Sequence, residues 1–228
     1  MCEHCGCEAG LKRKEITLEK NILEQNEHLA SKNRKHFDEK GIVAINLISA
    51  PGSGKTSLLE ATIAQLRDEI PLAVIEGDPE TERDAERIRR QGVPVVQVTT
   101  GGACHLDAVQ VHRAFHQLEK EKFRLLFIEN VGNLLCPSAF NLGEHLRVVL
   151  VSVPEGSDKP AKYPAAFYKA DVFLITKTDL LPYFDFDLEE AKSLALKINP
   201  RLRVIALSAK SGQGLEEWCQ LLRDLVFG

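Results

Sequence analysis

A phosphate-binding loop is the feature of this chain that most constrains its fold. The stretch Ser49-Ala50-Pro51-Gly52-Ser53-Gly54-Lys55-Thr56 follows an apolar, largely β-branched run and precedes an amphipathic helical segment. A glycine-rich turn of no special function could have a similar composition. The strand before it, the Lys-Thr pair and the helix after it together favour a P-loop, although Ser49 stands where the first glycine is usual.

The P-loop assigns a role to each of its residues. Backbone N–H groups at a helix N-terminus bind phosphate oxygens, Lys55 can reach the β- and γ-phosphates, and the Thr56 hydroxyl can bind Mg²⁺. The predicted phosphate-binding residues are Pro51, Gly52, Ser53, Gly54, Lys55, Thr56 and Ser57.

Short β-rich runs alternate with helical segments over the rest of the chain. The predicted strands are 42–48, 72–75, 95–98, 125–128, 148–153, 172–176 and 204–206. This alternation predicts an α/β, P-loop NTPase fold with a mostly parallel sheet of about seven strands and helices on both faces. Ligands of such sheets bind beyond the carboxyl ends of the strands, so we expect the chemistry to gather at that edge.

Composition and charge argue against some classes of binding partner. The 228 residues carry a net charge of -4, with no long basic block, which argues against a nucleic-acid surface. No apolar run approaches the ~18 residues of a membrane span, and the polar, cysteine-rich start does not resemble a signal peptide. We therefore expect a cytoplasmic protein without nucleic-acid or membrane partners, in which the six cysteines are metal ligands or buried thiols.

Two strand ends predict guanine recognition. In Thr176-Lys177-Thr178-Asp179 the Asp179 carboxylate can accept hydrogen bonds from guanine N1-H and the 2-amino group, while the Lys177 stem covers the ring. Adenine lacks that pair of donors. Ser208, Ala209 and Lys210 would add a backbone contact to guanine O6. The tetrapeptide alone could equally be a helix N-cap by Asp179, but its position after a P-loop favours GTP or GDP.

Two other strand ends carry carboxylates. Asp78 can bind Mg²⁺ or orient the attacking water, although Asp78-Pro79 before a helical run is also a good N-cap. Glu129 is expected to be buried and to need a partner, for which Mg²⁺ or its water shell is suitable. Gly132 leaves room for the γ-phosphate. Lys55, Asp78 and Glu129 are the catalytic candidates, and Thr56, Asp78 and Glu129 the magnesium ligands.

Thiols form two groups. Cys2, Cys5 and Cys7, with His4 or the terminal amine, can chelate one Zn²⁺ or Ni²⁺ ion, unless residues 1–15 are only a disordered tail. Cys104 and His105, expected to begin a helix, and Cys136 lie on two loops beside the γ-phosphate, where a metal could sense the nucleotide. Taken singly, each of these could be a buried thiol or a helix-start histidine. Cys219 is expected in the core.

Taken together, these motifs resemble the HypB family of hydrogenase nickel-incorporation GTPases, in the SIMIBI class of P-loop GTPases. The resemblance covers nearly the whole chain, through the cysteine-rich start, the P-loop, Glu76-Gly77-Asp78, Cys104-His105-Leu106-Asp107-Ala108 and the segment from Glu129 to Pro137. Thr176 replaces the more familiar asparagine of the guanine motif, and the long histidine tract of nickel-storing members is missing from the sequence.

The resemblance implies a GTPase that loads nickel into the large subunit of [NiFe]-hydrogenase, works with a HypA-type partner and dimerises when GTP binds. It also implies a tight nickel site at Cys2, Cys5 and Cys7, and a weaker nickel or zinc site at Cys104, His105 and Cys136 near the dimer interface. Residues 1–15 would be a metal-binding tail, 16–40 a flanking helix and 41–228 the GTPase domain. The alternatives are a metal buffer or sensor with a structural nucleotide site, and a related GTPase that serves urease or a cobalamin enzyme.

Overall fold

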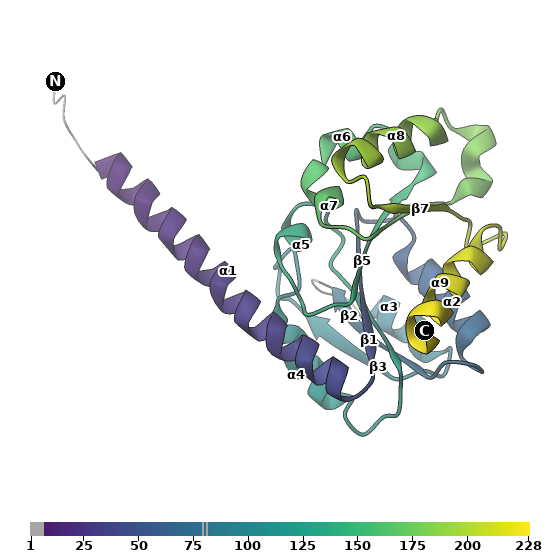
Figure 1. Ribbon diagram of the computed structural model, residues 1–228, viewed down its shortest axis with the longest axis horizontal. Coiled ribbons are helices and arrows are strands. Elements are labelled where there is room, and N and C mark those ends of the chain that lie inside the picture. The colour runs from purple at the N-terminus through teal and green to yellow at the C-terminus, as the bar shows by residue number, and fades with distance from the viewer. Residues whose placement is uncertain (1–6, 79, 81) are drawn as a thin grey trace.

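A seven-stranded sheet forms the centre of the molecule (Figure 1). The computed structural model describes residues 7–78, 80 and 82–228, with side chains from residue 21 onward. The strand order is β3-β2-β4-β1-β5-β6-β7, and every neighbouring pair is parallel. The predicted fold class is therefore confirmed.

All seven predicted strands are present, with small differences at their ends. They are β1 Val43–Ser49, β2 Leu72–Asp78, β3 Val95–Thr99, β4 Leu125–Glu129, β5 Leu146–Ser152, β6 Val172–Thr176 and β7 Arg203–Ala206. The largest difference is in β2, whose pairing with β3 continues to Asp78 and Thr99. Glu76, Gly77 and Asp78 therefore belong to the strand, where the sequence suggested a loop after it.

The α-helices in the described residues are α1 Cys7–Glu39, α2 Lys55–Leu66, α3 Arg83–Arg89, α4 Ala108–Gln117, α5 Cys136–Ala139, α6 Lys159–Lys162, α7 Pro164–Tyr168, α8 Leu188–Ile198 and α9 Leu215–Phe227. Two 3₁₀ turns, η1 Val153–Glu155 and η2 Thr178–Tyr183, follow β5 and β6. None of the helices in the described part is long and apolar enough to cross a membrane.

Helix α1 is longer than expected. It begins at Cys7, so the predicted boundary between a tail and a helix at residues 15 and 16 falls inside one continuous helix. Its C-terminal half packs against α4, with Ala30 and Phe37 fully buried. Phe37 meets the ring of Phe115 edge-on at 4.9 Å between centroids. This half of the helix therefore lies against the domain, where the sequence placed a flanking helix.

Helices cover both faces of the sheet. On one face, α2 and α9 bury Leu59, Ile63 and Trp218 against β1 and β4. The Trp218 indole N–H donates to Thr62 Oγ1 over 3.0 Å, which satisfies the one polar group of that buried ring. On the other face, α1 and α4 cover the β2–β4 side, and α7 and α8 cover the β5–β6 side. Cys219 is fully buried in the first layer, as predicted.

Candidate nucleotide and metal site

The P-loop connects β1 to α2 and turns at two glycines. Gly52 and Gly54 have φ angles of 76° and 94°, which glycine adopts without strain. Lys55 is the first residue of α2, and its Nζ donates to Ser49 Oγ over 3.0 Å. The hydroxyl at the unusual Ser49 position thus accepts a hydrogen bond from the lysine ammonium.

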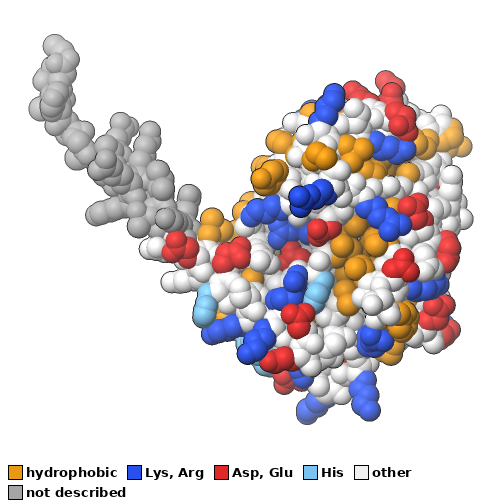
Figure 2. All heavy atoms as spheres, viewed as in Figure 1, with side chains coloured by type: hydrophobic (Ala, Val, Ile, Leu, Met, Phe, Trp, Pro, Cys, Tyr) orange, Lys and Arg blue, Asp and Glu red, His pale blue; other side chains and the backbone are white. Residues whose placement is uncertain are grey.

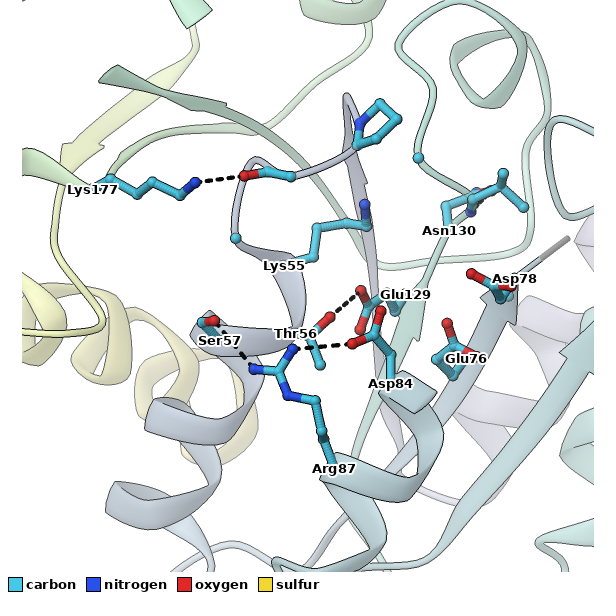
Figure 3. Close-up of a pocket in the computed structure, with 16 residues that line it drawn as sticks. Lys55, Thr56, Ser57, Glu76, Asp78, Asp84, Arg87, Glu129, Asn130 and Lys177 are labelled. Carbon is cyan, nitrogen blue, oxygen red and sulfur yellow. Dashed lines mark hydrogen bonds and ion pairs between the residues drawn. The ribbon is translucent and has the colours of Figure 1, made fainter. Parts of the chain in front are cut away.

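The guanine-motif strand is bound to the P-loop. Thr176 Oγ1 donates to the Ser53 carbonyl over 2.6 Å. Lys177 Nζ donates to the Gly52 carbonyl over 2.6 Å (Figure 3). Lys177 has a φ of 58°, a left-handed conformation that directs its side chain back over the loop. Thr176, which departs from the familiar asparagine, therefore still provides a side-chain link between the base-binding and phosphate-binding loops.

The two segments predicted to bind guanine lie side by side. Ser208 Oγ donates to Asp179 Oδ1 over 2.6 Å, and the same hydroxyl accepts from Ser211 N–H over 3.1 Å. Ala209 and Lys210 follow Ser208 in the loop after β7. This contact orients the Asp179 carboxylate, as its predicted role in accepting two guanine hydrogens requires.

A cleft of about 460 Å³ extends from the P-loop to the ends of β2 and β4. Its lining contains most of the predicted phosphate-binding and carboxylate residues, namely Pro51, Gly52, Gly54, Lys55, Thr56, Ser57, Asp78, Glu129, Gly132 and Lys177. Ser53 faces the other way, where its hydroxyl donates to Glu155 Oε2 over 2.6 Å. The sequence therefore predicted correctly that separate strand ends meet at one edge.

Three carboxylates gather beside Thr56. Oxygen atoms of Glu76, Asp84 and Glu129 lie within 4.8 Å of one another, and Thr56 Oγ1 donates to Glu129 Oε1 over 2.9 Å. Glu76 Oε2 and Glu129 Oε2 are buried without a hydrogen-bond partner among the described residues. Buried acceptors that lack a donor fit a hard divalent cation, so this oxygen-only set suits Mg²⁺.

The carboxylates also perturb one another. Burial, reinforced by the charges of Glu129 and Asp78, raises the pKa of Glu76 to about 8. Burial raises the pKa of Glu129 to about 7, against the opposing effect of Lys55 and Thr56. Both carboxyl groups therefore hold a proton more tightly than an exposed glutamate does, and a bound cation would replace those protons.

Sequence reasoning placed Asp78 in the magnesium set, whereas this cluster contains Glu76 and Asp84. Asp78 lines the same cleft and accepts from Glu80 N–H over 2.9 Å. The alternative that Asp78 caps the following helix is wrong, because α3 begins at Arg83 with Glu82 as its N-cap.

Asp84 and Arg87 were missed from the sequence. Arg87 Nη1 donates to Asp84 Oδ1 over 3.0 Å, and Nη2 donates to Ser57 Oγ on α2 over 3.3 Å (Figure 3). Nη2 also donates to Glu60 Oε2 on α2 over 2.6 Å. The Asp-x-x-Arg spacing on one helix face was the available signal. It could not show that α3 would bring this pair onto the P-loop helix.

The structure brings together the three residues of the second predicted metal site. One ligand atom each of Cys104, His105 and Cys136 lies within 4.8 Å of the others, and Cys104 Sγ lies 3.7 Å from His105 Nδ1. The His105 ring stacks on Phe140 at 3.9 Å between centroids. Hydrogen bonding with Cys136 and burial raise the pKa of the Cys104 thiol, and burial lowers the pKa of His105. A neutral imidazole and two converging thiols suit Ni²⁺ or Zn²⁺.

The helix predicted to start at Cys104-His105 begins later. Asp107 caps α4: its side chain accepts from Gln110 N–H over 2.7 Å, and Gln110 Oε1 accepts from Asp107 N–H over 2.9 Å. This reciprocal capping fixes Ala108 as the first helical residue, so Cys104 and His105 lie in the loop before it. Cys136, expected in a loop, is the first residue of the short α5.

The loop of residues 100–107 between β3 and α4, which we call the metal loop, contacts the edge of the sheet that carries the P-loop at two points. Leu106 N–H donates to Asn130 Oδ1 over 3.0 Å, and Asn130 directly follows Glu129. A Cβ added to Gly77 would lie 2.7 Å from Leu106 Cγ, so β2 and the metal loop are in direct contact. Gly132, in the loop after β4, likewise packs closely on Pro51 of the P-loop, because an added Cβ would lie 3.1 Å from Pro51 Cα. The loops that follow β3 and β4 are thereby linked to the phosphate site.

Comparison with known proteins is consistent with this geometry. Residues 43–206 match the family described as CobW/HypB/UreG, nucleotide-binding domain. The chain belongs to the CobW/HypB/UreG family. A hydrogenase maturation factor HypB from Azotobacter chroococcum mcd 1 is 54% identical over 203 residues, covering 89% of this chain and 67% of that protein. A hydrogenase/urease maturation factor HypB from Helicobacter pylori strain J99 is 41% identical, covering 94% of this chain and 89% of that protein.

Among solved structures, HypB from Helicobacter pylori in complex with nickel superimposes with a TM-score of 0.85 at 39% identity, covering 89% of this chain and 95% of that one. The CobW/HypB/UreG match spans the P-loop, the carboxylate cluster, Cys104, Cys136 and Asp179. It ends just before Ser208. Cys2 and Cys5 lie outside the residues that the structure describes, and so does the side chain of Cys7.

Proposed function

We propose that this chain is a GTP-hydrolysing metallochaperone that helps insert nickel into the large subunit of [NiFe]-hydrogenase. The observation that carries the proposal is the hydrogen bond between Leu106 and Asn130, which joins a thiol and imidazole cluster to the phosphate end of a nucleotide site. The names of the HypB relatives support the choice of cargo and client.

In the nucleotide half of the site, different residues bind the base, the phosphates and the magnesium ion. Asp179, oriented by Ser208, selects guanine, and the P-loop N–H groups with Lys55 bind the β- and γ-phosphates. Lys55 exchanges its bond to Ser49 for the phosphate oxygens when GTP enters. Thr56 and the carboxylates of Glu76, Asp84 and Glu129 hold Mg²⁺, which neutralises charge on the phosphates. Asp78, at the rim of the same cleft, is the candidate that orients the attacking water.

The metal half uses Cys104, His105 and Cys136 to hold Ni²⁺ or Zn²⁺. Nucleotide exchange repositions the loop after β4, and the contacts of Asn130 and Gly77 transmit that movement to Leu106. Linkage requires the converse as well, so bound metal must change the affinity for GTP by the same factor. The proposal has three further parts. Two chains pair around this site when GTP binds, the chain works with a HypA-type partner, and Cys2, Cys5 and Cys7 supply nickel.

The decisive experiment measures hydrogenase maturation in a strain that lacks its own HypB. The natural chain is expected to restore activity, and Lys55→Ala to fail because it cannot bind the γ-phosphate productively. Lys162→Ala is the matched control, since Lys162 pairs with the exposed Asp158 at the surface, away from the P-loop. Full maturation by Lys55→Ala would instead support a metal buffer or sensor whose nucleotide site is structural.

A client other than hydrogenase is the second alternative, because one relative is named for both hydrogenase and urease. Complementation of a urease-maturation mutant in parallel separates the two clients. Restoration of urease without hydrogenase would overturn the proposed client and leave the GTPase cycle intact.

A further inference from the structure

Three histidines form a cluster that shares no residue with the two sites above. His112 and His116 lie one turn apart on α4, and His36 reaches them from α1. One ring nitrogen of each lies within 4.8 Å of the others, with His36 and His112 half-buried and His116 exposed. Figure 2 shows histidine side chains at the surface beside α1. Because His116 is exposed, ions from solvent can reach the cluster.

The hydrogen bonds fix which nitrogen of His112 carries a proton. Asn33 Nδ2 donates to the carbonyls of Ala108 and Leu142, over 2.9 and 3.1 Å. The amide orientation of Asn33 is thereby set, and its Oδ1 faces His112 Nδ1 at 2.9 Å. Because Oδ1 can only accept, His112 Nδ1 must be the protonated nitrogen, and Nε2 of the neutral ring carries a lone pair.

The same argument applies to His116. Its Nδ1 lies 2.9 Å from Glu119 Oε1, and an ionised carboxylate only accepts hydrogen bonds. His116 Nε2 therefore also carries a lone pair when the ring is neutral. Yet the two Nε2 atoms face each other at 3.0 Å. Two lone pairs at that distance repel, so the arrangement needs a cation between them.

A proton on His116 would bridge only these two rings. A metal ion accepts lone pairs from all three rings together, and a ring nitrogen of His36 also lies within 4.8 Å of the other two. The outward-held Nδ1–H groups, bonded to an amide and a carboxylate, are the supports that orient metal-binding imidazoles.

We propose that His36, His112 and His116 bind a late first-row divalent metal ion, such as Zn²⁺ or Ni²⁺, through three imidazole nitrogens. Imidazole suits these ions, and histidines four residues apart on a helix are a common chelating pair. Since His36 lies on α1 and the other two on α4, the bound ion cross-links these helices.

The test uses the full chain with Cys2, Cys5, Cys7, Cys104 and Cys136 replaced by alanine, which removes the thiol ligands. Co²⁺ and Ni²⁺ are titrated by absorption and calorimetry. We expect one ion per chain with no sulfur-to-metal charge-transfer band. His36→Gln and His116→Gln are each expected to weaken binding at least about tenfold, in line with losses seen on disturbing metal sites. His28→Gln, an exposed histidine on α1, is the matched control and should bind normally.

A second measurement avoids dependence on the multiply substituted chain. In the otherwise natural protein, zinc retained after desalting is counted by elemental analysis. His36→Gln/His116→Gln is expected to lose one equivalent that His28→Gln keeps. Equal zinc in all three proteins, or cobalt uptake that neither histidine change affects, would overturn the proposal.

Discussion

The backbone N–H of Leu106 donates to the side-chain oxygen of Asn130 over 3.0 Å. Leu106 follows the Cys104-His105 pair, and Asn130 follows Glu129 of the carboxylate cluster. Asn130 Oδ1 also accepts from Val131 N–H over 3.0 Å, and its amide donates to Asn46 Oδ1 over 3.2 Å. One buried amide therefore holds the metal loop, the loop after β4 and the central strand in a single arrangement.

Replacing Asn130 by alanine is expected to uncouple the metal site from the nucleotide. Loss of these buried bonds should lower the free energy of unfolding by about 1–3 kcal/mol. The ratio of Ni²⁺ affinities between the GTP-analogue and GDP states should fall toward one. Calorimetric titration of Ni²⁺ into each nucleotide state measures that ratio.

Asn46→Ala is the control for this change. It removes the bond from the Asn130 amide but leaves the acceptor for Leu106 in place. It should lower stability while keeping the coupling. If Asn130→Ala retains the full affinity ratio, the coupling does not pass through this residue.

Gly77 of β2 provides a second contact with the loop that carries Leu106. Because an added Cβ would lie 2.7–2.9 Å from the fully buried Leu106 side chain, Gly77→Ala should destabilise the chain by about 1–3 kcal/mol. Leu106→Val frees space, so the double variant is expected to recover part of that loss. Chemical unfolding of the two single variants and the double variant forms a thermodynamic cycle. Strictly additive losses would show that the two side chains do not compete for space.

The carboxylate cluster predicts an unusual pH dependence. The pKa of Glu76 is about 8 in the folded chain against 4.5 for an ordinary glutamate. The folded state therefore binds one more proton than the unfolded state between those values. Stability is fully present below pH 4.5 and falls as the pH rises through about 8, by a few kcal/mol since one pKa unit is about 1.4 kcal/mol.

Unfolding in urea from pH 5 to 9, with EDTA and without nucleotide, measures this slope. Glu76→Gln should flatten it and raise stability at the alkaline end, and Mg²⁺ with GDP should flatten it in the natural chain. Glu129, whose pKa is about 7, leaves a smaller slope in the variant. Glu86→Gln, a surface carboxylate of α3, should leave the slope as it is. An unaltered slope in Glu76→Gln would contradict the assignment.

The strands and the P-loop could be predicted from sequence because local signals determine them. β-branched apolar runs specify buried parallel strands, and Gly52 and Gly54 are placed where the backbone of the loop has positive φ angles. The convergence of Thr56 and Glu129, which are distant in sequence, followed from one rule about the carboxyl ends of parallel strands.

Other parts of the site depend on tertiary packing. Asp84 enters the carboxylate cluster only because Arg87 ties α3 to α2, and no local pattern reveals that docking. His36 meets His112 and His116 only because α1 lies along α4. The late start of α4 was visible in principle, since Asp107 and Gln110 are spaced as a capping box.

Guanine selection provides the most direct test of the nucleotide assignment. Asp179→Asn replaces a group that accepts two hydrogens by one that accepts and donates, which matches the xanthine ring and mismatches guanine. Loss of a bidentate, charge-assisted pair should weaken GDP binding about 100-fold, or about 2.7 kcal/mol, while xanthosine diphosphate gains affinity. Competition against a fluorescent GDP analogue measures both nucleotides. Asp187→Asn, at the N-cap of α8, changes the same residue type away from the base site and should bind GDP normally. Undiminished GDP affinity in Asp179→Asn would mean that Asp179 orients Ser208 without touching the base.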